Sequence, residues 1–137
     1  MKTIFDFLTP KNKTFYLNHD ATIRQIVETF DVHKFSVVPL IDEDGKFIST
    51  ISEGDVLRFI KNHCQFDVYM AEDVRINTIE LYRPYKALLI SASLDEVIKL
   101  TLEQNFIPVV DDRGMYIGII KRKTIIDYLL KEKPIVN

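Results

Sequence analysis

The sequence predicts a mixed α/β (α+β) fold built from two copies of one β-α-β-β-α unit. Three observations support it: a segment that occurs twice, a helical pattern before each copy, and a helical pattern after it. The 137 residues are 47% hydrophobic and 28% charged, which is enough to bury a core without disulfides. One unit alone has too little core, so we expect the two copies to pack with pseudo-twofold symmetry.

The segment that occurs twice is a predicted β-hairpin. Residues 38–49, Val-Pro-Leu-Ile-Asp-Glu-Asp-Gly-Lys-Phe-Ile-Ser, align without a gap with residues 107–118, Ile-Pro-Val-Val-Asp-Asp-Arg-Gly-Met-Tyr-Ile-Gly. In each copy, apolar runs flank acidic residues and a glycine, a pattern typical of two antiparallel strands joined by a tight turn. The strand that opens each copy is expected at residues 14–17 and 87–90.

Helices are predicted on both sides of each hairpin. A row of residues at i, i+3, i+4 and i+7 starts at Ile23 and at Leu94, apolar throughout except for the last position of the second row. Further helices are expected at about residues 53–62 and 122–130. Both first helices are preceded by the pattern of a capping box, Thr22-x-x-Gln25 and Ser93-x-x-Glu96.

The two copies are joined by a long predicted linker that has some strand character at residues 74–81. The expected organisation is a first repeat at 1–65, the linker at 66–85 and a second repeat at 86–137.

Composition argues against several functional classes. A net charge of -2 gives no global basic field for nucleic acid. The single cysteine, Cys64, excludes an intramolecular disulfide. No stretch approaches the roughly 18 apolar residues of a membrane span, and Asp6 interrupts the apolar N-terminus, so we expect a cytoplasmic protein. The histidines do not form a metal-binding pattern, and no nucleophile lies in a recognisable catalytic motif. We therefore expect no metal, no cofactor and no enzyme activity.

The repeat resembles a known family. The β-α-β-β-α pattern, with Val-Pro-Leu-Ile-Asp at 38–42 and Ile-Pro-Val-Val-Asp at 107–111, resembles a tandem CBS (Bateman) module over nearly the whole chain. Residues 7–10 and 118–123 are similar to the bacterial stand-alone CBS-pair proteins that bind cyclic di-AMP. This resemblance implies a small cytosolic homodimer that acts on a partner enzyme, such as a (p)ppGpp synthetase or pyruvate carboxylase, according to its ligand state.

The turn between hairpin and helix in the first repeat is Ser52-Glu53-Gly54-Asp55, which we call the first turn. It resembles the family's Ser/Thr-x-x-Asp motif, which implies a hydroxyl for a phosphate oxygen and a carboxylate for both hydroxyls of a ribose diol. The same pattern is a helix capping box, and the two roles can coexist. The site that the resemblance implies around this turn comprises Ser52, Asp55, Tyr85, Lys86, Asn105 and Phe106.

The corresponding turn of the second repeat, Lys121-Arg122-Lys123-Thr124, is the basic turn. Thr124 replaces the aspartate, and two cations stand at a helix N-terminus that already favours anions. A cyclic dinucleotide has two phosphates and no free cis-diol, so it suits this turn better than AMP or ATP; a solvated basic helix start is the alternative.

The main site implied by the resemblance joins the basic turn to residues of the first repeat. Lys13 would be a polar contact, Ser36 and Val37 would offer backbone groups to adenine, and Phe35 either stacks on a base or belongs to the core. The full set is Lys13, Phe15, Phe35, Ser36, Val37, Lys121, Arg122, Lys123 and Thr124.

The sequence thus leads to the hypothesis of a regulatory protein whose ligand is cyclic di-AMP. Two alternatives stay open. One is an AMP or ATP sensor that uses Ser52 and Asp55, and the other is a dimerisation or scaffold module without a ligand.

Overall fold

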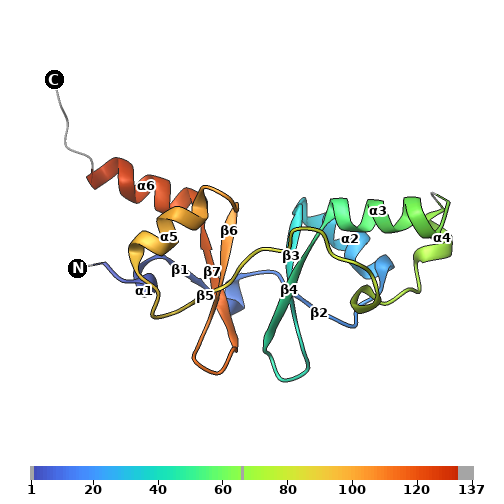
Figure 1. Cartoon of the computed structure of the whole chain (residues 1–137), viewed down its shortest axis with the longest axis horizontal. Helices are drawn as coiled ribbons and strands as arrows, with labels where there is room; N and C mark the ends of the chain where they lie inside the picture. Colours follow the sequence, from blue (N-terminus) through green and yellow to red (C-terminus); the bar gives the residue numbers. More distant parts are fainter. Residues whose placement is uncertain (1, 66, 133–137) are drawn as a thin grey trace. The chain divides into compact units, whose positions relative to one another are not determined.

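A computed structural model describes residues 2–65 and 67–132 of the chain (Figure 1). The backbone forms two compact units, each described by itself. Unit 1 comprises Met1–Thr14 and Tyr85–Asn137, and unit 2 comprises Phe15–Pro84. The N-terminal segment therefore groups with the second repeat, whereas the repeat pattern predicts residues 1–65 as the first repeat.

Unit 2 contains a three-stranded sheet in the order β2-β3-β4, in which β2 is parallel and β4 antiparallel to β3. Its elements are β2 (Leu17–Asn18), α2 (Ile23–His33), β3 (Val37–Ile41), β4 (Phe47–Ser52), α3 (Glu53–His63), α4 (Val68–Ala71) and the 3-10 turn η2 (Ile76–Thr78).

Unit 1 contains a four-stranded sheet in the order β1-β7-β6-β5. Its N-terminal strand β1 pairs antiparallel with β7, with Leu8 opposite Ile120 and Pro10 opposite Gly118. The elements are α1 (Ile4–Phe7), β1 (Leu8–Pro10), the 3-10 turn η1 (Lys11–Lys13), β5 (Leu88–Leu89), α5 (Leu94–Thr101), β6 (Phe106–Val110), β7 (Tyr116–Lys121) and α6 (Arg122–Glu132).

The two predicted hairpins are confirmed as β3–β4 and β6–β7, and they match in detail. Each has a register shift at its last pair, Ile41 with Phe47 and Val110 with Tyr116. In the second hairpin, Asp111 Oδ1 accepts the backbone N–H groups of Arg113 and Met115, both at 2.9 Å. The bond from Met115 is the main reason that the pKa of Asp111 is lowered, since it stabilises the carboxylate form.

The helices are also confirmed, but the first strand of each repeat is shorter than predicted. The expected strands at 14–17 and 87–90 are replaced by Leu17–Asn18 and Leu88–Leu89. In the first repeat, Thr14 is held in unit 1 by a hydrogen bond of 2.8 Å to the Tyr116 hydroxyl. It therefore follows the sheet of the other unit, and β2 starts only at Leu17.

Residues 67–84 of the predicted linker are a folded part of unit 2. Ala71, Ile76 and Ile79 are buried in the same core as α2, β3 and α3. The expected strand character at 74–81 was wrong, because this segment forms η2 and a single bridge between Thr22 and Arg75.

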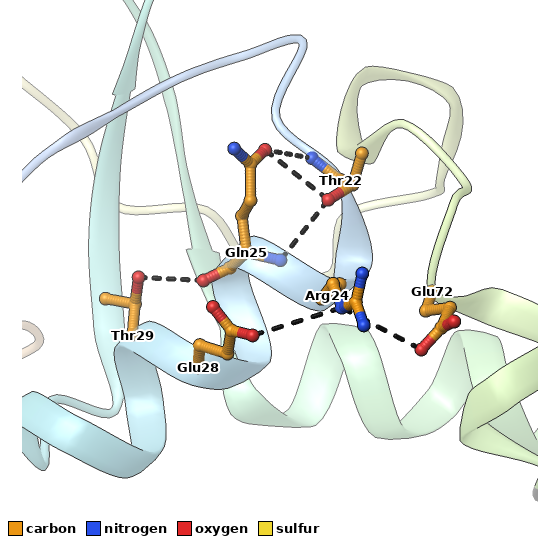
Figure 2. Close-up of polar contacts among 6 residues, drawn as sticks. All are labelled: Thr22, Arg24, Gln25, Glu28, Thr29 and Glu72. Carbon is orange, nitrogen blue, oxygen red and sulfur yellow. Dashed lines mark hydrogen bonds and ion pairs between the residues drawn. The ribbon is translucent and has the colours of Figure 1, made fainter.

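Residues 72–74 of this linker close the N-terminus of α2, where Figure 2 shows Glu72 facing Arg24. Thr22 forms the predicted capping box with Gln25. The next two backbone N–H groups donate across the chain, Ile23 to Val74 O at 2.8 Å and Arg24 to Glu72 O at 3.1 Å. These bonds satisfy groups that a helix start otherwise leaves to solvent, so α2 offers no N-terminal anion site.

The Arg24 side chain adds an electrostatic contact to this junction. Its guanidinium lies 4.0 Å from carboxylate oxygens of both Glu28 and Glu72 (Figure 2). In α5, by contrast, only half of the predicted capping box forms: Ser93 Oγ accepts the Glu96 N–H at 3.2 Å. None of the helices among the described residues is long and apolar enough to cross a membrane.

Candidate functional site

The first turn forms a complete capping box at the start of α3. Asp55 N–H donates to Ser52 Oγ at 3.1 Å, and Ser52 N–H donates to Asp55 Oδ2 at 2.9 Å. The structural interpretation of this motif is therefore confirmed. Only 1% of the Asp55 surface is exposed, so its carboxylate is held inside unit 2.

The other oxygen of Asp55 has a partner from the linker. Tyr82 N–H donates to Asp55 Oδ1 at 2.7 Å, and Arg58 Nη1 lies 3.5 Å from the same oxygen. Both carboxylate oxygens are thus engaged within unit 2. The Tyr82 contact could not be predicted from the sequence, because every residue except proline has a backbone N–H.

The basic turn begins α6 directly after β7 and is held by two bonds from Arg122. The Arg122 N–H donates to Asn105 O at 3.0 Å, and Arg122 Nε donates to Thr101 O at 2.7 Å. Unit 2 has the equivalent of the first bond, from Glu53 N–H to Ser36 O at 3.0 Å. The guanidinium is thus fixed through Nε, and its two terminal nitrogens are oriented as a fork of donors.

The other three predicted side chains of the basic turn differ from Arg122. Lys123 Nζ lies 3.2 Å from Asp127 Oδ2, and its side chain is 86% exposed. A ligand phosphate would have to compete with Asp127 for this cation. Lys121 is exposed and Thr124 is half-buried, so Arg122 is the best-ordered cation of the turn.

Lys13 lies in unit 1, but not beside the basic turn. Strand β1 runs antiparallel to β7, so its first residue lies opposite Ile120 and its last residue opposite Gly118. The chain then enters η1, which contains Lys13. The Thr14 bond to Tyr116 fixes this direction. Tyr116 and Lys121 are five residues apart on one strand, or about 16 Å at roughly 3.3 Å per residue. Lys13 is the last residue of the 3-10 turn η1.

The predicted aromatic residues of the first repeat form a cluster at the end of α2. The half-buried Phe15 ring lies 4.6 Å from His33 and 6.1 Å from Phe35, measured between centroids. His33 and Phe35 are stacked at 5.8 Å with an interplanar angle of 10°. Phe35 is 44% exposed, so one part of its ring is available. The sequence did not assign a role to His33, which completes this cluster.

In unit 1, four residues predicted for the second site gather around a buried glutamine. Gln104 Oε1 accepts Lys86 N–H at 2.7 Å, and Gln104 Nε2 donates to the carbonyls of Lys86 and Phe106 at 3.1 Å each. The Tyr85 ring packs edge-on against Phe106 at 4.9 Å, and its hydroxyl accepts Asn105 N–H at 3.4 Å. Gln104 was missed because a single polar residue before a strand carries no specific signal.

Each predicted site takes residues from both units. The structure brings Phe15, Phe35, Ser36 and Val37 into unit 2, and Lys13 with the basic turn into unit 1. Ser52 and Asp55 likewise belong to unit 2, while Tyr85, Lys86, Asn105 and Phe106 belong to unit 1. Assembly of either site across the units stays a prediction. Among the described residues, no group of His, Cys, Asp and Glu is arranged to hold a metal ion.

The repeat has a counterpart among known families. The model of the CBS domain matches residues 5–62 and again residues 78–131. This chain belongs to the CBS domain family. The two matches coincide with the two hairpin-and-helix repeats, so the protein is a CBS pair, as the sequence had led us to expect.

Individual relatives are distant, yet the fold is closely shared. An uncharacterised protein of Methanocaldococcus jannaschii, MJ1426, is 25% identical over 86% of this chain and 87% of its own length. The crystal structure of CbpB in complex with c-di-AMP matches with a TM-score of 0.81 at 20% identity, covering 95% of this chain and 85% of that one. The structure of CBSX2 in complex with AMP, a protein known from Arabidopsis thaliana, matches with a TM-score of 0.76 at 24% identity, covering 98% and 100%.

Proposed function

We propose that this CBS pair is a regulatory nucleotide-binding protein whose ligand is cyclic di-AMP. The observation that carries the proposal is the basic turn, in which the Arg122 guanidinium is anchored through Nε at the N-terminus of an 11-residue helix. A fixed fork of donors beside helix N–H groups favours a phosphate. The aspartate that would favour a ribose diol is replaced by Thr124 in this turn.

The state of the first turn supports the same choice. The family motif binds a cis-diol through its carboxylate, and at Asp55 a diol would have to compete with the backbone N–H groups that both oxygens already accept. Cyclic di-AMP has no such diol, so it does not require Asp55. We propose that the adenine bases are held by the aromatic cluster of Phe15, His33 and Phe35, since exposed rings stack on bases of any identity.

AMP or ATP is the second candidate, because CBSX2, a distant relative, has been crystallised with AMP. This alternative uses Ser52 and Asp55, and it requires that Asp55 exchange its Tyr82 partner for the ribose. A module without any ligand is the third candidate.

We further propose that ligand binding acts on a partner enzyme through a homodimer. Unit 2 has a cleft of about 480 Å³ between α2 and α3 with a largely apolar lining that includes Val27, Phe30 and Leu57. Leu57 is 61% exposed, and a second copy packed on this face would bury it. Ligand binding would then shift the population of the conformations of the dimer and so change the surface offered to the partner enzyme. We propose a (p)ppGpp synthetase or pyruvate carboxylase as this kind of enzyme.

The dimer proposal predicts that Leu57→Glu yields a monomer, because the new carboxylate would have to leave water for a largely apolar interface. Sedimentation equilibrium measures the result. Asn62→Glu is the matched control, since five residues along α3 place it about 140° around the helix from Leu57. A Leu57→Glu protein that sediments like the wild type would contradict this interface.

The ligand is tested by calorimetric titration of nucleotide-free protein with cyclic di-AMP, AMP, ATP, NAD and S-adenosylmethionine. The proposal predicts that cyclic di-AMP binds with a Kd in the micromolar range or below and at least tenfold more tightly than AMP. Tighter binding of AMP would favour the second candidate, and no heat from any ligand would favour the scaffold.

A further inference from the structure

Residues 79–84, which we call the strap, lie against the first turn within unit 2. Two side chains anchor them: Ile79 is 8% exposed in the core of the unit, and Leu81 packs against the same core from its edge. These anchors fix the position of the next residue, Tyr82. The strap is therefore part of the folded unit and is presented to Asp55 in a defined way.

The backbone N–H of Tyr82 bonds to the first turn, and the Tyr82 ring contacts two arginines. The Tyr82 N–H donates to Asp55 Oδ1 at 2.7 Å. The Arg58 guanidinium lies 4.4 Å from the centroid of the Tyr82 ring, and that of Arg83 lies 5.3 Å from it. Arg58 also approaches the carboxylate at 3.5 Å, so it contacts both partners of the Tyr82–Asp55 bond.

The space beside the strap is too small for a nucleotide. A cavity of about 90 Å³ is lined by Tyr82, Arg58, Phe59 and three polar neighbours on α3 and the strap. Pockets for small molecules usually measure roughly 300–1,000 Å³. Asp55 does not line this cavity and is only 1% exposed, so a ligand reaches its carboxylate only if the residues that cover it move, among them Tyr82, which bonds to it.

The strap also contains a strained residue that would assist such a movement. Arg83 has a φ of 56°, in the left-handed region that a side chain with a Cβ avoids. It precedes Pro84, and a residue before proline favours an extended conformation. Release of the strap would let Arg83 return to that conformation, which partly offsets the loss of the Tyr82–Asp55 bond.

We propose that the strap is a built-in competitor for Asp55, and that Tyr82 thereby determines ligand specificity at the first turn. The Tyr82 N–H and the Arg58 guanidinium both approach Asp55 Oδ1, so a ribose hydroxyl would have to compete with them for the two lone pairs of this oxygen. A nucleotide with a free cis-diol therefore binds there only after the strap is displaced. A ligand without a diol is unaffected. This inference rests on the proposed nucleotide-binding function and adds the element that selects against mononucleotides.

The matched variants Tyr82→Pro and Tyr82→Ala test the strap in the full chain. Both remove the ring, but only proline removes the N–H donor. Calorimetric titration with AMP is expected to give a Kd at least tenfold lower for Tyr82→Pro than for Tyr82→Ala. Leu81→Ala, which keeps every donor and weakens one anchor, is expected to tighten AMP binding relative to the wild type even if the proline variant does not fold.

Amide hydrogen exchange of the wild type gives an independent readout. The Tyr82 N–H is expected to be protected in the free protein, to lose protection with saturating AMP, and to keep it with cyclic di-AMP. The inference is overturned if folded Tyr82→Pro and Leu81→Ala bind AMP no more tightly than their controls, or if AMP binds while the Tyr82 N–H stays protected. Failure of cyclic di-AMP to bind any of these proteins would contradict the proposed ligand and leave the AMP comparison intact.

Discussion

Gly118→Ala is expected to destabilise the protein by about 3 kcal/mol, the largest effect of any single substitution considered. Gly118 has a φ of 151° and faces Pro10 across the β1–β7 pair. A Cβ at this position would collide with the backbone carbonyl of Thr9 and lie 3.0 Å from a Leu8 methyl group. The alanine is therefore compatible with this sheet only if β1 moves away from β7.

The free energy of unfolding from urea denaturation, followed by circular dichroism, measures this effect. Gly54→Ala is the control, because a Cβ there meets Ser52 Oγ at an ordinary 3.6 Å on α3. Alanine should be neutral or stabilise that helix by about 0.5–1 kcal/mol. Equal unfolding free energies for the two variants would show that β1 does not pair closely with β7.

Arg122→Ala is expected to raise the Kd for cyclic di-AMP by about 10- to 100-fold. Hydrogen bonds to charged groups contribute roughly 1.5–3 kcal/mol, and each 1.4 kcal/mol is about a factor of ten in affinity. Arg122→Lys should lose nearly as much, since a lysine cannot reproduce both the Thr101 bond and a bidentate phosphate contact. Lys123→Ala should lose less, because Asp127 already pairs with Lys123.

Lys131→Ala is the matched control for this series. It removes the same charge from the last turn of α6, about nine residues from the basic turn in a helix that rises roughly 1.5 Å per residue. Its Kd should stay within about twofold of the wild type. If Arg122→Ala and Lys131→Ala weaken binding equally, the effect is one of net charge, and the basic turn is not the phosphate site.

Local patterns predicted much of each repeat. The alignment of residues 38–49 with 107–118 located both hairpins, and the structure adds that they share a register shift at Ile41 and Val110. The i, i+3, i+4 pattern located α2 and α5, and Thr22 caps α2 as expected. These features could be predicted because hydrophobic periodicity and capping depend on residues only a few positions apart in the chain.

Contacts between distant segments were not predictable in the same way. Nothing in Leu8 or Pro10 indicates that β1 joins the sheet of the second repeat, and nothing in residues 72–74 indicates that they close the start of α2. Both contacts use backbone groups, which every residue has. The resemblance located the first turn, but the bond from Tyr82 that occupies Asp55 appears only in the folded unit.

Binding of cyclic di-AMP at the basic turn can be located by mapping backbone amide chemical shifts during titration of the ¹⁵N-labelled protein. We expect the largest shift changes at Arg122, Lys123 and Thr124, and unchanged amide shifts at Ser52 and Asp55. Shifts concentrated at Ser52 and Asp55, with the basic turn unchanged, would contradict it.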